Sequence, residues 1–503
     1  MNLKQYLEHH NIVTNPFSDE DAQTDLVFKS YCISHTYHPT WDKIYGNPAE
    51  PATAVVFGEK GSGKTAMKLQ IAQHLEHYNL DHTDDQVFAV EYDDFNPFLD
   101  EFRDRFRFRR PKIEKILEQW KLWDHMDAIL SLATTQLVDR ILGSEKARYA
   151  AAVHTKSDTL RNPAKKLDQS QRRDLLLLAA CYDRSTAQSG DDRWNRLCGK
   201  LRFYTWKSLW DFALPIVGLI VLIAVMWHWD HWDWLKCKWT YIGYGVLWLP
   251  RLWRCMKAWY RARKVRRNTR VINQNGKRLR KIFRRLTEKQ LASQPLPTAQ
   301  RTDDRYELLA KLQNILAMFG FPGVIVLVDR VDEPYLINGT ANLMKSLLWP
   351  MLDNKLLKHP GVGIKLLLPE ELCYFVDGEG REFHQRARLD KQNLVRSLAW
   401  TGESLYDVAN ARLAACAASG VDKKPTLDDL FDESITHQRM LEAFRSLRVP
   451  RHMFKFLYRV IVAHTNAHTE SNPSWRISSA DFESTLAVYL RDQDNFDRGT
   501  GAV

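Results

Sequence analysis

The glycine-rich stretch GEKGSGKT, from Gly58 to Thr65, has the residue types and spacing of a phosphate-binding loop. Its glycines let the backbone adopt conformations that are closed to other residues, so that successive N–H groups can surround a phosphate. Lys64 would place a cation on the β- and γ-phosphates, and the Thr65 hydroxyl would complete the coordination of Mg²⁺. We therefore expect this loop to bind ATP together with Mg²⁺.

The flanking sequence places the loop between a strand and a helix. Residues 52–57 form an apolar run that predicts a strand, and a helical pattern begins at Ala66. A chance glycine-rich turn is the alternative, but such a turn requires neither a preceding strand nor Lys-Thr at its end. The residues expected to contact the nucleotide are Gly58, Glu59, Lys60, Gly61, Ser62, Gly63, Lys64, Thr65 and Ala66.

A second group of candidate residues follows the apolar run in the segment VIVLVDRVDEP, residues 324–334. Asp329 ends the expected strand and is placed to hold the water shell of Mg²⁺. Glu333 would accept a proton from an attacking water, and Asp332 would orient that water or bind the metal from outside. An acid-rich turn without chemistry is the alternative. The expected catalytic residues are Lys64, Asp332 and Glu333, and the expected metal ligands are Thr65 and Asp329.

These residues need a sheet to position them. Further apolar runs at 86–95 and 363–372 predict two more core strands, which indicates an α/β core of three layers. The phosphate-binding loop and Asp329 are separated by far more chain than normally connects core strands, so a module must be inserted between them. Residues 423–503 have a helical pattern and predict a lid after the core.

The net charge of +11 is concentrated in one segment. Residues 251–291 contain sixteen Lys and Arg against one acid, Glu288, so the remainder is slightly acidic. This distribution argues against a protein that coats nucleic acid through a generally basic surface. Seven scattered cysteines without a C-x-x-C pair indicate a reducing compartment. The N-terminal residues show no pattern of a cleaved signal peptide.

Two apolar runs, residues 212–227 and 239–250, lie just before the basic segment and are bordered by tryptophans. The first approaches the ~20 residues that a transmembrane helix needs, and the second is shorter and would cross only if tilted. Together they predict a transmembrane hairpin with basic residues at both feet. The positive-inside rule then places the protein in the inner membrane, with its N- and C-terminal parts in the cytoplasm. A buried hairpin in a soluble domain is the alternative.

The basic segment 251–291 has three interpretations. Its position beside the hairpin favours contact with anionic lipid, to which each cation near the surface contributes about 1 kcal/mol. Binding of DNA or RNA is the rival interpretation. A solvated helix face without a partner is the third.

The segment IVLVDRVDE, together with a membrane hairpin between the two nucleotide motifs, resembles the KAP-type P-loop ATPases of the STAND class. The resemblance covers residues 54–98 and 308–461, and Arg330 departs from it where a second Asp is often found. It implies a P-loop NTPase core of the ASCE or AAA-like kind. It also implies ATP hydrolysis that drives a conformational or assembly switch in a homo-oligomer, in bacteria often at the membrane and sometimes in defence against phage.

The same resemblance suggests which arginines reach the nucleotide. The stretch LRVPRHMFKFLYRVIVAH is similar to the lid helix of related ATPases, which implies that Arg451, and more weakly Arg448, points at the nucleotide. Arg386 and Arg388 would be arginine fingers that act on a neighbouring copy, or else ordinary surface arginines. The end of the strand at 363–372 offers no Asn or Thr for sensing the γ-phosphate, so that role is unassigned.

We therefore predict a membrane-anchored ATPase that switches its assembly, with an unidentified protein partner. A soluble nucleic-acid-responsive ATPase and a nucleotide-gated scaffold or pore with little turnover are the alternatives. The expected units are the lead-in and first part of the core at 1–98, a helical insertion at 99–204, the hairpin at 205–256, a basic segment at 257–302, the second part of the core at 303–422 and the lid at 423–503.

Overall fold

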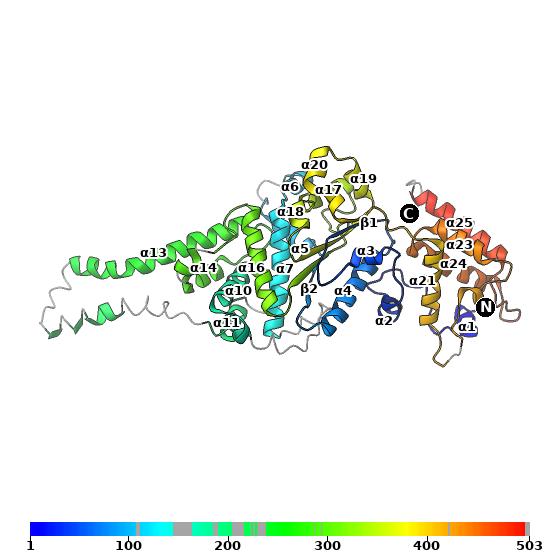
Figure 1. Ribbon diagram of the computed structural model, residues 1–503, viewed down its shortest axis with the longest axis horizontal. Coiled ribbons are helices and arrows are strands. Elements are labelled where there is room, and N and C mark those ends of the chain that lie inside the picture. The colour runs from blue at the N-terminus through cyan, green and yellow to red at the C-terminus, as the bar shows by residue number, and fades with distance from the viewer. Residues whose placement is uncertain are drawn as a thin grey trace.

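The computed structural model describes residues 1–106, 111–143, 163–184, 190–203, 216–221, 223–224, 227–228, 238–286, 288–292, 294–420 and 423–497. A five-stranded parallel sheet lies at the centre of the fold (Figure 1), in the order β2-β3-β4-β1-β5. The strands are β1 (Ala54–Gly58), β2 (Val87–Tyr92), β3 (Gly323–Val328), β4 (Val362–Pro369) and β5 (Asn393–Val395). The predicted α/β class is confirmed.

Helices cover both faces of this sheet, because side chains alternate between the faces along each strand. Val55 and Phe57 pack with one hydrophobic cluster, whereas Val56 packs with the other. On the first face lie α7 (Leu122–Leu142) and α16 (Thr302–Met318). The second face is covered by α3 (Trp41–Tyr45) and α4 (Lys64–Asp81), the helix that follows the glycine-rich loop.

The chain between β2 and β3 adds helices that are fixed to the core by buried ion pairs. Arg305 of α16 donates two hydrogen bonds to Asp127 of α7, at 3.0 and 3.1 Å, and both side chains are fully buried. The Tyr182 hydroxyl, at the end of α10 (Gln169–Tyr182), donates to the same carboxylate at 2.8 Å. Burying charges in this way is costly unless the partners are all in place. The inserted helices therefore have a defined position on the sheet.

Helix α13 (Lys238–Asn268) extends away from the sheet, with α14 (Gly276–Arg285) beside its C-terminal half (Figure 1). Within the described residues, no helix combines the length and the hydrophobicity needed to cross a bilayer. The first predicted apolar run, 212–227, and the expected tip of the hairpin, 228–234, both lie partly outside those residues. The transmembrane hairpin thus has no support from the fold and stays a prediction.

Part of the basic segment faces the protein itself. Arg270 donates to Asp124 of α7, with Nε 3.0 Å from the carboxylate, and Arg278 lies 3.7 Å from Asp183. Other cations of this segment, such as Arg263 and Arg267, are exposed. The segment is therefore divided between a structural role and an outward-facing one.

The first seventeen residues pack with the C-terminal helices rather than with the sheet. Tyr6 and Phe17 belong to the same hydrophobic cluster as Leu457, and Ile12 forms an antiparallel bridge with Ala417. This cluster is built by α1 (Leu3–His9), α21 (Gly402–Ala415), α23 (His437–Leu447), α24 (Pro450–Ala467) and α25 (Ser479–Asp497). We call these five helices the C-terminal unit.

The remaining helices are short or peripheral. They are α2 (Leu26–Ser30), α5 (Asn96–Asp104), α6 (Ile113–Leu117), α9 (Pro163–Lys166), α11 (Gly190–Lys200), α15 (Glu288–Ala292), α17 (Ala341–Leu348), α18 (Asn354–Leu357), α19 (Glu371–Asp377), α20 (Arg381–Ala387), α22 (Leu427–Leu430) and the 3₁₀ helices at Cys32–Ser34, Trp349–Met351 and Leu389–Lys391.

We expect the free energy of unfolding to decrease on acidification, because His125 is buried in its neutral form. The ring is fully buried between the Tyr92 hydroxyl (3.1 Å) and the Leu347 carbonyl (2.8 Å), and burial lowers its pKa to about 4. Below its ordinary pKa the unfolded chain binds a proton that the native state does not. Native stability should therefore drop by about 1.4 kcal/mol per pH unit between pH 6.5 and 4.

Urea unfolding at pH 7 and pH 5 measures this effect, with His125→Gln as the comparison. The substituted protein should be less stable at pH 7 but should lose about 2 kcal/mol less than the wild type on going to pH 5. Equal losses in the two proteins would contradict the assignment.

Candidate nucleotide-binding site

The loop between β1 and α4 has the backbone shape that its glycines permit. Gly61 and Gly63 both have positive φ, +92° and +93°, which side-chain-bearing residues rarely adopt. A Cβ at Gly61 would also lie 2.6 Å from the Cβ of Arg451, so the first residues of α24 rest directly on the loop. The Arg451 backbone N–H donates to the Gly61 carbonyl at 3.4 Å. The start of α24 thus holds the loop in place through Arg451.

Lys64 is turned back onto its own loop. Its Nζ donates to the carbonyls of Gly58 and Glu59, at 2.7 and 2.8 Å. Burial lowers the pKa of Lys64, and the carboxylates of Asp329 and Asp332 offset part of that shift. A negatively charged ligand would therefore meet a partly desolvated cation with neutral partners.

Thr65 and Asp329 meet directly, although they lie 264 residues apart in the chain. The Thr65 hydroxyl donates to Oδ2 of Asp329 at 2.9 Å. The Asp329 side chain is 1% exposed, and burial raises the pKa of its carboxyl, against the effect of the hydrogen bond from Thr65 and the charge of Lys68. The sheet thus brings together the two residues that the sequence analysis named as metal ligands.

A buried lysine, Lys68, lies near this contact, and its charge acts on the Asp329 carboxylate. Lys68, one turn after Lys64 on α4, forms an ion pair with Asp93 and lies 3.5 Å from Glu91. Burial alone would lower the pKa of Lys68, but the two carboxylates more than offset it, so that the pKa is raised. This pairing fixes the end of β2 against α4.

The other predicted acids lie in the turn after Asp329. Asp332 and Glu333 both line the same pocket as Lys64 and Thr65. The Glu333 carboxylate is 2.6 Å from Nη2 of Arg330 and is about half exposed. The structure therefore brings both acids to the candidate site, with Glu333 in an ion pair.

Of the four arginines predicted to reach a nucleotide, one lines the pocket and three lie outside its lining. Arg451 lines the pocket, whereas Arg448 lies 3.9 Å from Glu59 at the edge of the loop. Arg386 and Arg388 do not belong to the pocket lining in the described chain; the first lies over the Phe383 ring and the second pairs with Asp390. A role for either in a neighbouring copy stays a prediction.

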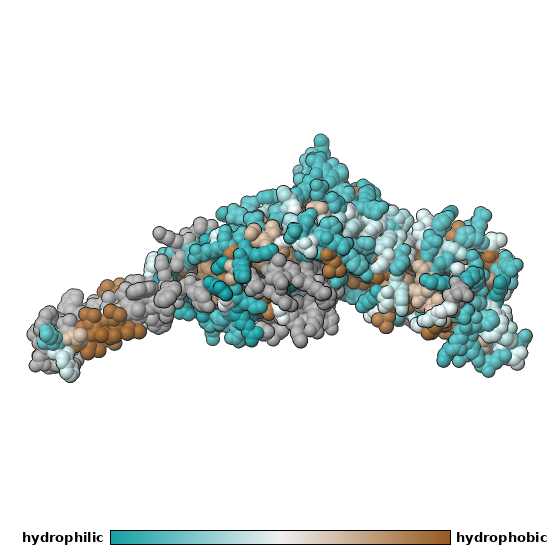
Figure 2. Space-filling model, turned by 60° about the horizontal axis from the view of Figure 1, so that its bottom comes forward, coloured by the Kyte–Doolittle hydropathy of each residue, from teal (hydrophilic) through white to brown (hydrophobic). Residues whose placement is uncertain are grey.

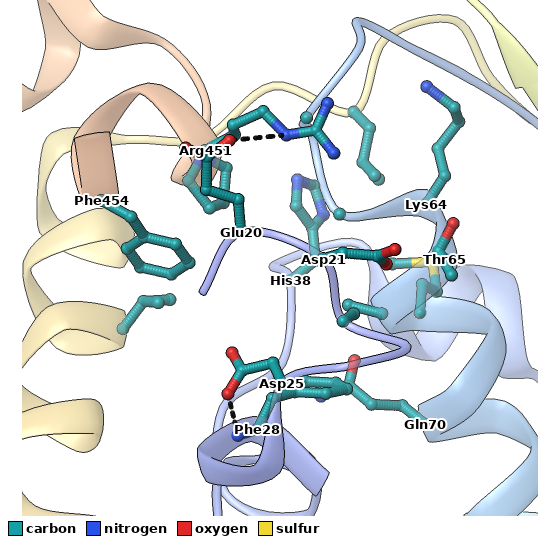
Figure 3. A pocket seen from close by; sticks show the side chains of 18 of the residues that line it. Glu20, Asp21, Asp25, Phe28, His38, Lys64, Thr65, Gln70, Arg451 and Phe454 are labelled. Atoms are coloured by element: carbon teal, nitrogen blue, oxygen red, sulfur yellow. Dashed lines mark hydrogen bonds and ion pairs between the residues drawn. The ribbon is translucent and has the colours of Figure 1, made fainter. Parts of the chain in front are cut away.

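Much of the pocket lining could not be predicted from the sequence. The segment 20–38 supplies acidic and uncharged side chains to the lining, and Asp21 among them lies beside Thr65, with Phe454 of the C-terminal unit on the other side of the pocket (Figure 3). Trp400, just after β5, donates its indole N–H to the Ser62 carbonyl at 2.8 Å. The lining residues that were not predicted include Glu20, Asp21, Asp25, Phe28, Thr36, His38, Gln70, Trp400, Arg412 and Phe454.

The chemistry of this site fits a nucleotide whose metal is held partly by its phosphates. Among the described residues, no group of three or more His, Cys, Asp or Glu is arranged to hold a cation by itself. Mg²⁺ in nucleotide sites is usually held by one or two protein oxygens, substrate phosphates and water. Thr65 and Asp329 supply such a pair. The Ser62 hydroxyl is buried without a protein partner, and Gly61 and Gly63 supply the conformations that a phosphate cradle needs.

Comparisons with known proteins add no relative. A scan against protein-family models, a search of curated proteins and a search of solved structures each find no significant match to this chain.

Asp329→Asn should stabilise the protein without ligand, because it removes a buried charge and leaves the shape unchanged. At pH 8 the thermal midpoint should rise by about 2–4 °C. The difference from the wild type should shrink on acidification, since the raised pKa means that the native carboxyl takes up its proton earlier than the unfolded one. Differential scanning calorimetry at pH 8 and pH 5 measures both effects.

Asp93→Asn is the matched control. It removes a partner of buried Lys68 and should lower stability by about 1–3 kcal/mol. A loss of stability in Asp329→Asn comparable to that of the control would show that Asp329 has a structural role instead.

Proposed function

We propose that this protein binds and hydrolyses ATP with Mg²⁺ and uses the reaction as a switch. The observation that carries the proposal is the hydrogen bond from Thr65 to Asp329 beneath a loop whose glycines have the required backbone shape. The strand order supports it, because β4 lies between β1 and β3 as expected of an ASCE-like core. Within this proposal the chain is a KAP-type ATPase of the STAND class.

The residues divide the work as follows. The loop from Gly58 to Ala66 would hold the phosphates through its N–H groups, with Lys64 adding charge on the β- and γ-phosphates. Thr65 and Asp329 would hold Mg²⁺, which neutralises the charge that develops on the phosphates. Glu333 would take a proton from the attacking water, and Asp332 would orient that water.

Arg451 offers a route from the nucleotide to the C-terminal unit. Arg451 lies in the first turn of α24 and its backbone N–H donates to the Gly61 carbonyl of the loop. A displacement of the loop on phosphate binding would therefore move α24. In the proposed switch this movement alters the assembly of several copies or the grip on a protein partner. Defence of a bacterium against phage is the setting that the family resemblance favours.

We also propose that α13 attaches the protein to the inner membrane. Exposed apolar side chains recur along one side of the helix at Val246, Leu249, Trp253, Met256 and Tyr260. Figure 2 shows hydrophobic residues near the far end of the projection to which this helix belongs. Such an exposed apolar surface is unusual for a protein that meets only water.

The tryptophans and cations of the same helix suit a lipid headgroup region. Three tryptophans of α13 carry a cation over their rings, and such aromatic and basic residues gather at bilayer interfaces. The pairs are Trp248 with Arg251 (5.0 Å), Trp253 with Lys257 (5.3 Å) and Trp259 with Arg263 (5.2 Å). The proposed attachment includes the hairpin 205–256 as its membrane part, anionic lipid as its partner, and the cytoplasm as the side of the core.

Two variants should distinguish ATP binding from ATP hydrolysis, because one removes binding and the other removes only hydrolysis. Lys64→Ala should abolish binding of a fluorescent ATP analogue, because the loop loses its cation. Glu333→Gln should keep binding but slow hydrolysis by about 10²- to 10⁴-fold, the usual contribution of a general base. Equilibrium binding and single-turnover hydrolysis measure the two steps.

Lys358→Ala is the control, because Lys358 is an exposed lysine that lies outside the pocket lining. It should change binding by no more than about threefold, as expected of an exposed charge. Equal losses in the Lys358 and Lys64 variants would show that general charge, and not a specific contact, drives binding. Unaltered hydrolysis in Glu333→Gln would favour another base or a nucleotide-gated scaffold.

Vesicle flotation tests the membrane attachment. The intact protein should float with vesicles containing phosphatidylserine, and replacing Leu249, Leu252, Trp253 and Met256 by Ser should lower the bound fraction at least tenfold, since each buried apolar side chain contributes about 1.5–3 kcal/mol.

The matched control places Ser at Tyr374 and Val488, which are exposed elsewhere on the surface and should not affect flotation. Binding of the four-Ser variant to nucleic acid at unchanged affinity, without any wild-type flotation, would instead support the nucleic-acid interpretation.

A further inference from the structure

Arg330 occupies an unusual place beside the candidate site. It directly follows Asp329 at the end of β3 and has φ +60°, a left-handed conformation that is uncommon for an arginine. This conformation turns the chain so that the guanidinium points along the acid-rich turn and not away from it. Holding such a backbone costs energy, so the contacts that the side chain makes must compensate.

Those contacts are with a predicted catalytic acid and with a distant segment. Nη2 of Arg330 lies 2.6 Å from Oε2 of Glu333, and Nη1 donates to Oε1 of Gln23 at 3.0 Å. Burial would lower the pKa of Arg330, but the hydrogen bond and charge of Glu333, with the carboxylates of Asp329 and Asp93 at longer range, raise it above its usual value. Arg330 is therefore a fixed cation with two specific partners.

The segment that contains Gln23 is itself tied to the C-terminal unit. Arg412 of α21 binds Asp25 at 2.5 Å and the Pro16 carbonyl at 2.6 Å. Lys455 of α24 lies 3.2 Å from Glu20, on the other side of Gln23. A displacement of the C-terminal unit would thus move the segment that contacts Arg330 through Gln23.

We propose that Arg330 is a positioning residue that restrains Glu333 and releases it when the C-terminal unit moves. The inference rests on the proposed ATP hydrolysis and adds its regulation. In that reaction the water oxygen bonds to the γ-phosphorus, Glu333 takes one water proton, and the bond from phosphorus to the ADP oxygen breaks. The ion pair with Arg330 occupies one oxygen of the Glu333 carboxylate and fixes its orientation, so the transfer of the proton is faster after the ion pair opens.

Single-turnover hydrolysis with excess enzyme tests this restraint. Arg330→Gln should raise the rate about threefold to fivefold, the factor by which a partly exposed ion pair shifts such an equilibrium, and should leave ATP affinity unchanged. Arg330→Lys keeps the charge and should restore the slower rate at least in part. Gln23→Ala removes one of the two contacts and should accelerate the reaction in the same direction but by less.

A double-mutant cycle separates restraint from a general effect on the fold. In a Glu333→Gln background, Arg330→Gln should produce no acceleration, because the group that it restrains is gone. Arg396→Gln is the control, since this arginine also forms an exposed ion pair, with Asp377, but lies outside the pocket lining. It should leave the rate unchanged.

Two outcomes would overturn the inference alone. A slower reaction in Arg330→Gln at unchanged ATP affinity would make Arg330 a supporting catalytic group, and an equal acceleration in the Glu333→Gln background would make its effect indirect. Absence of Lys64-dependent ATP binding in the wild type would instead remove the proposed function, and the inference with it.

Discussion

The hydrogen bond between Thr65 and Asp329 depends on almost every other feature of the fold. Its two residues follow β1 and β3, which are not neighbours in the sheet, because β4 lies between them. Parallel strands bring their carboxyl ends to one edge, so the register of β4 with both neighbours sets the height of the two residues. A shift of one residue in either pairing would separate them by more than 3 Å along the strand and turn side chains to the opposite face. The apolar packing on both faces of the sheet thus serves to hold this contact.

Features encoded by neighbouring residues could be predicted from the sequence, and features encoded by distant contacts could not. The strand, loop and helix around Lys64 follow from apolar runs and glycine spacing, and β3 and β4 end within a few residues of the predicted positions. The pocket wall built by residues 20–38 was missed, because its placement depends on contacts such as that of Asp25 with Arg412, which lie 387 residues apart. Nothing in the local pattern of residues 1–17 indicates that they complete a core formed by the last hundred residues.

For the basic segment, too, the sequence predicts the total charge but not the partners of the individual charges. A sum over residues 251–291 gives a strongly positive region, but the sum does not say which cations already have partners. Arg270 pairs with Asp124 and Arg278 with Asp183, and Leu279 and Phe283, which share α14 with Arg278, are buried. The exposed part of the segment is therefore smaller than its composition suggests, and on α13 it combines cationic side chains with tryptophans.

Some charged side chains at the candidate site already have protein partners, and others are poorly compensated. A charged ligand would therefore replace existing ion pairs as well as form new contacts. Burial disfavours the charged forms of both Lys64 and Asp329, so part of the site's charge is poorly compensated by the protein alone. Other cations near the pocket already face carboxylates, as Lys455 does with Glu20. A triphosphate and its metal ion would compensate the first pair and compete for the second. Since Glu20 lies on the segment that ties Arg330 to the C-terminal unit, that competition would, in the proposed function, link phosphate binding to the position of the helices. The free energy available for a switch is the difference between these two sets of ion pairs.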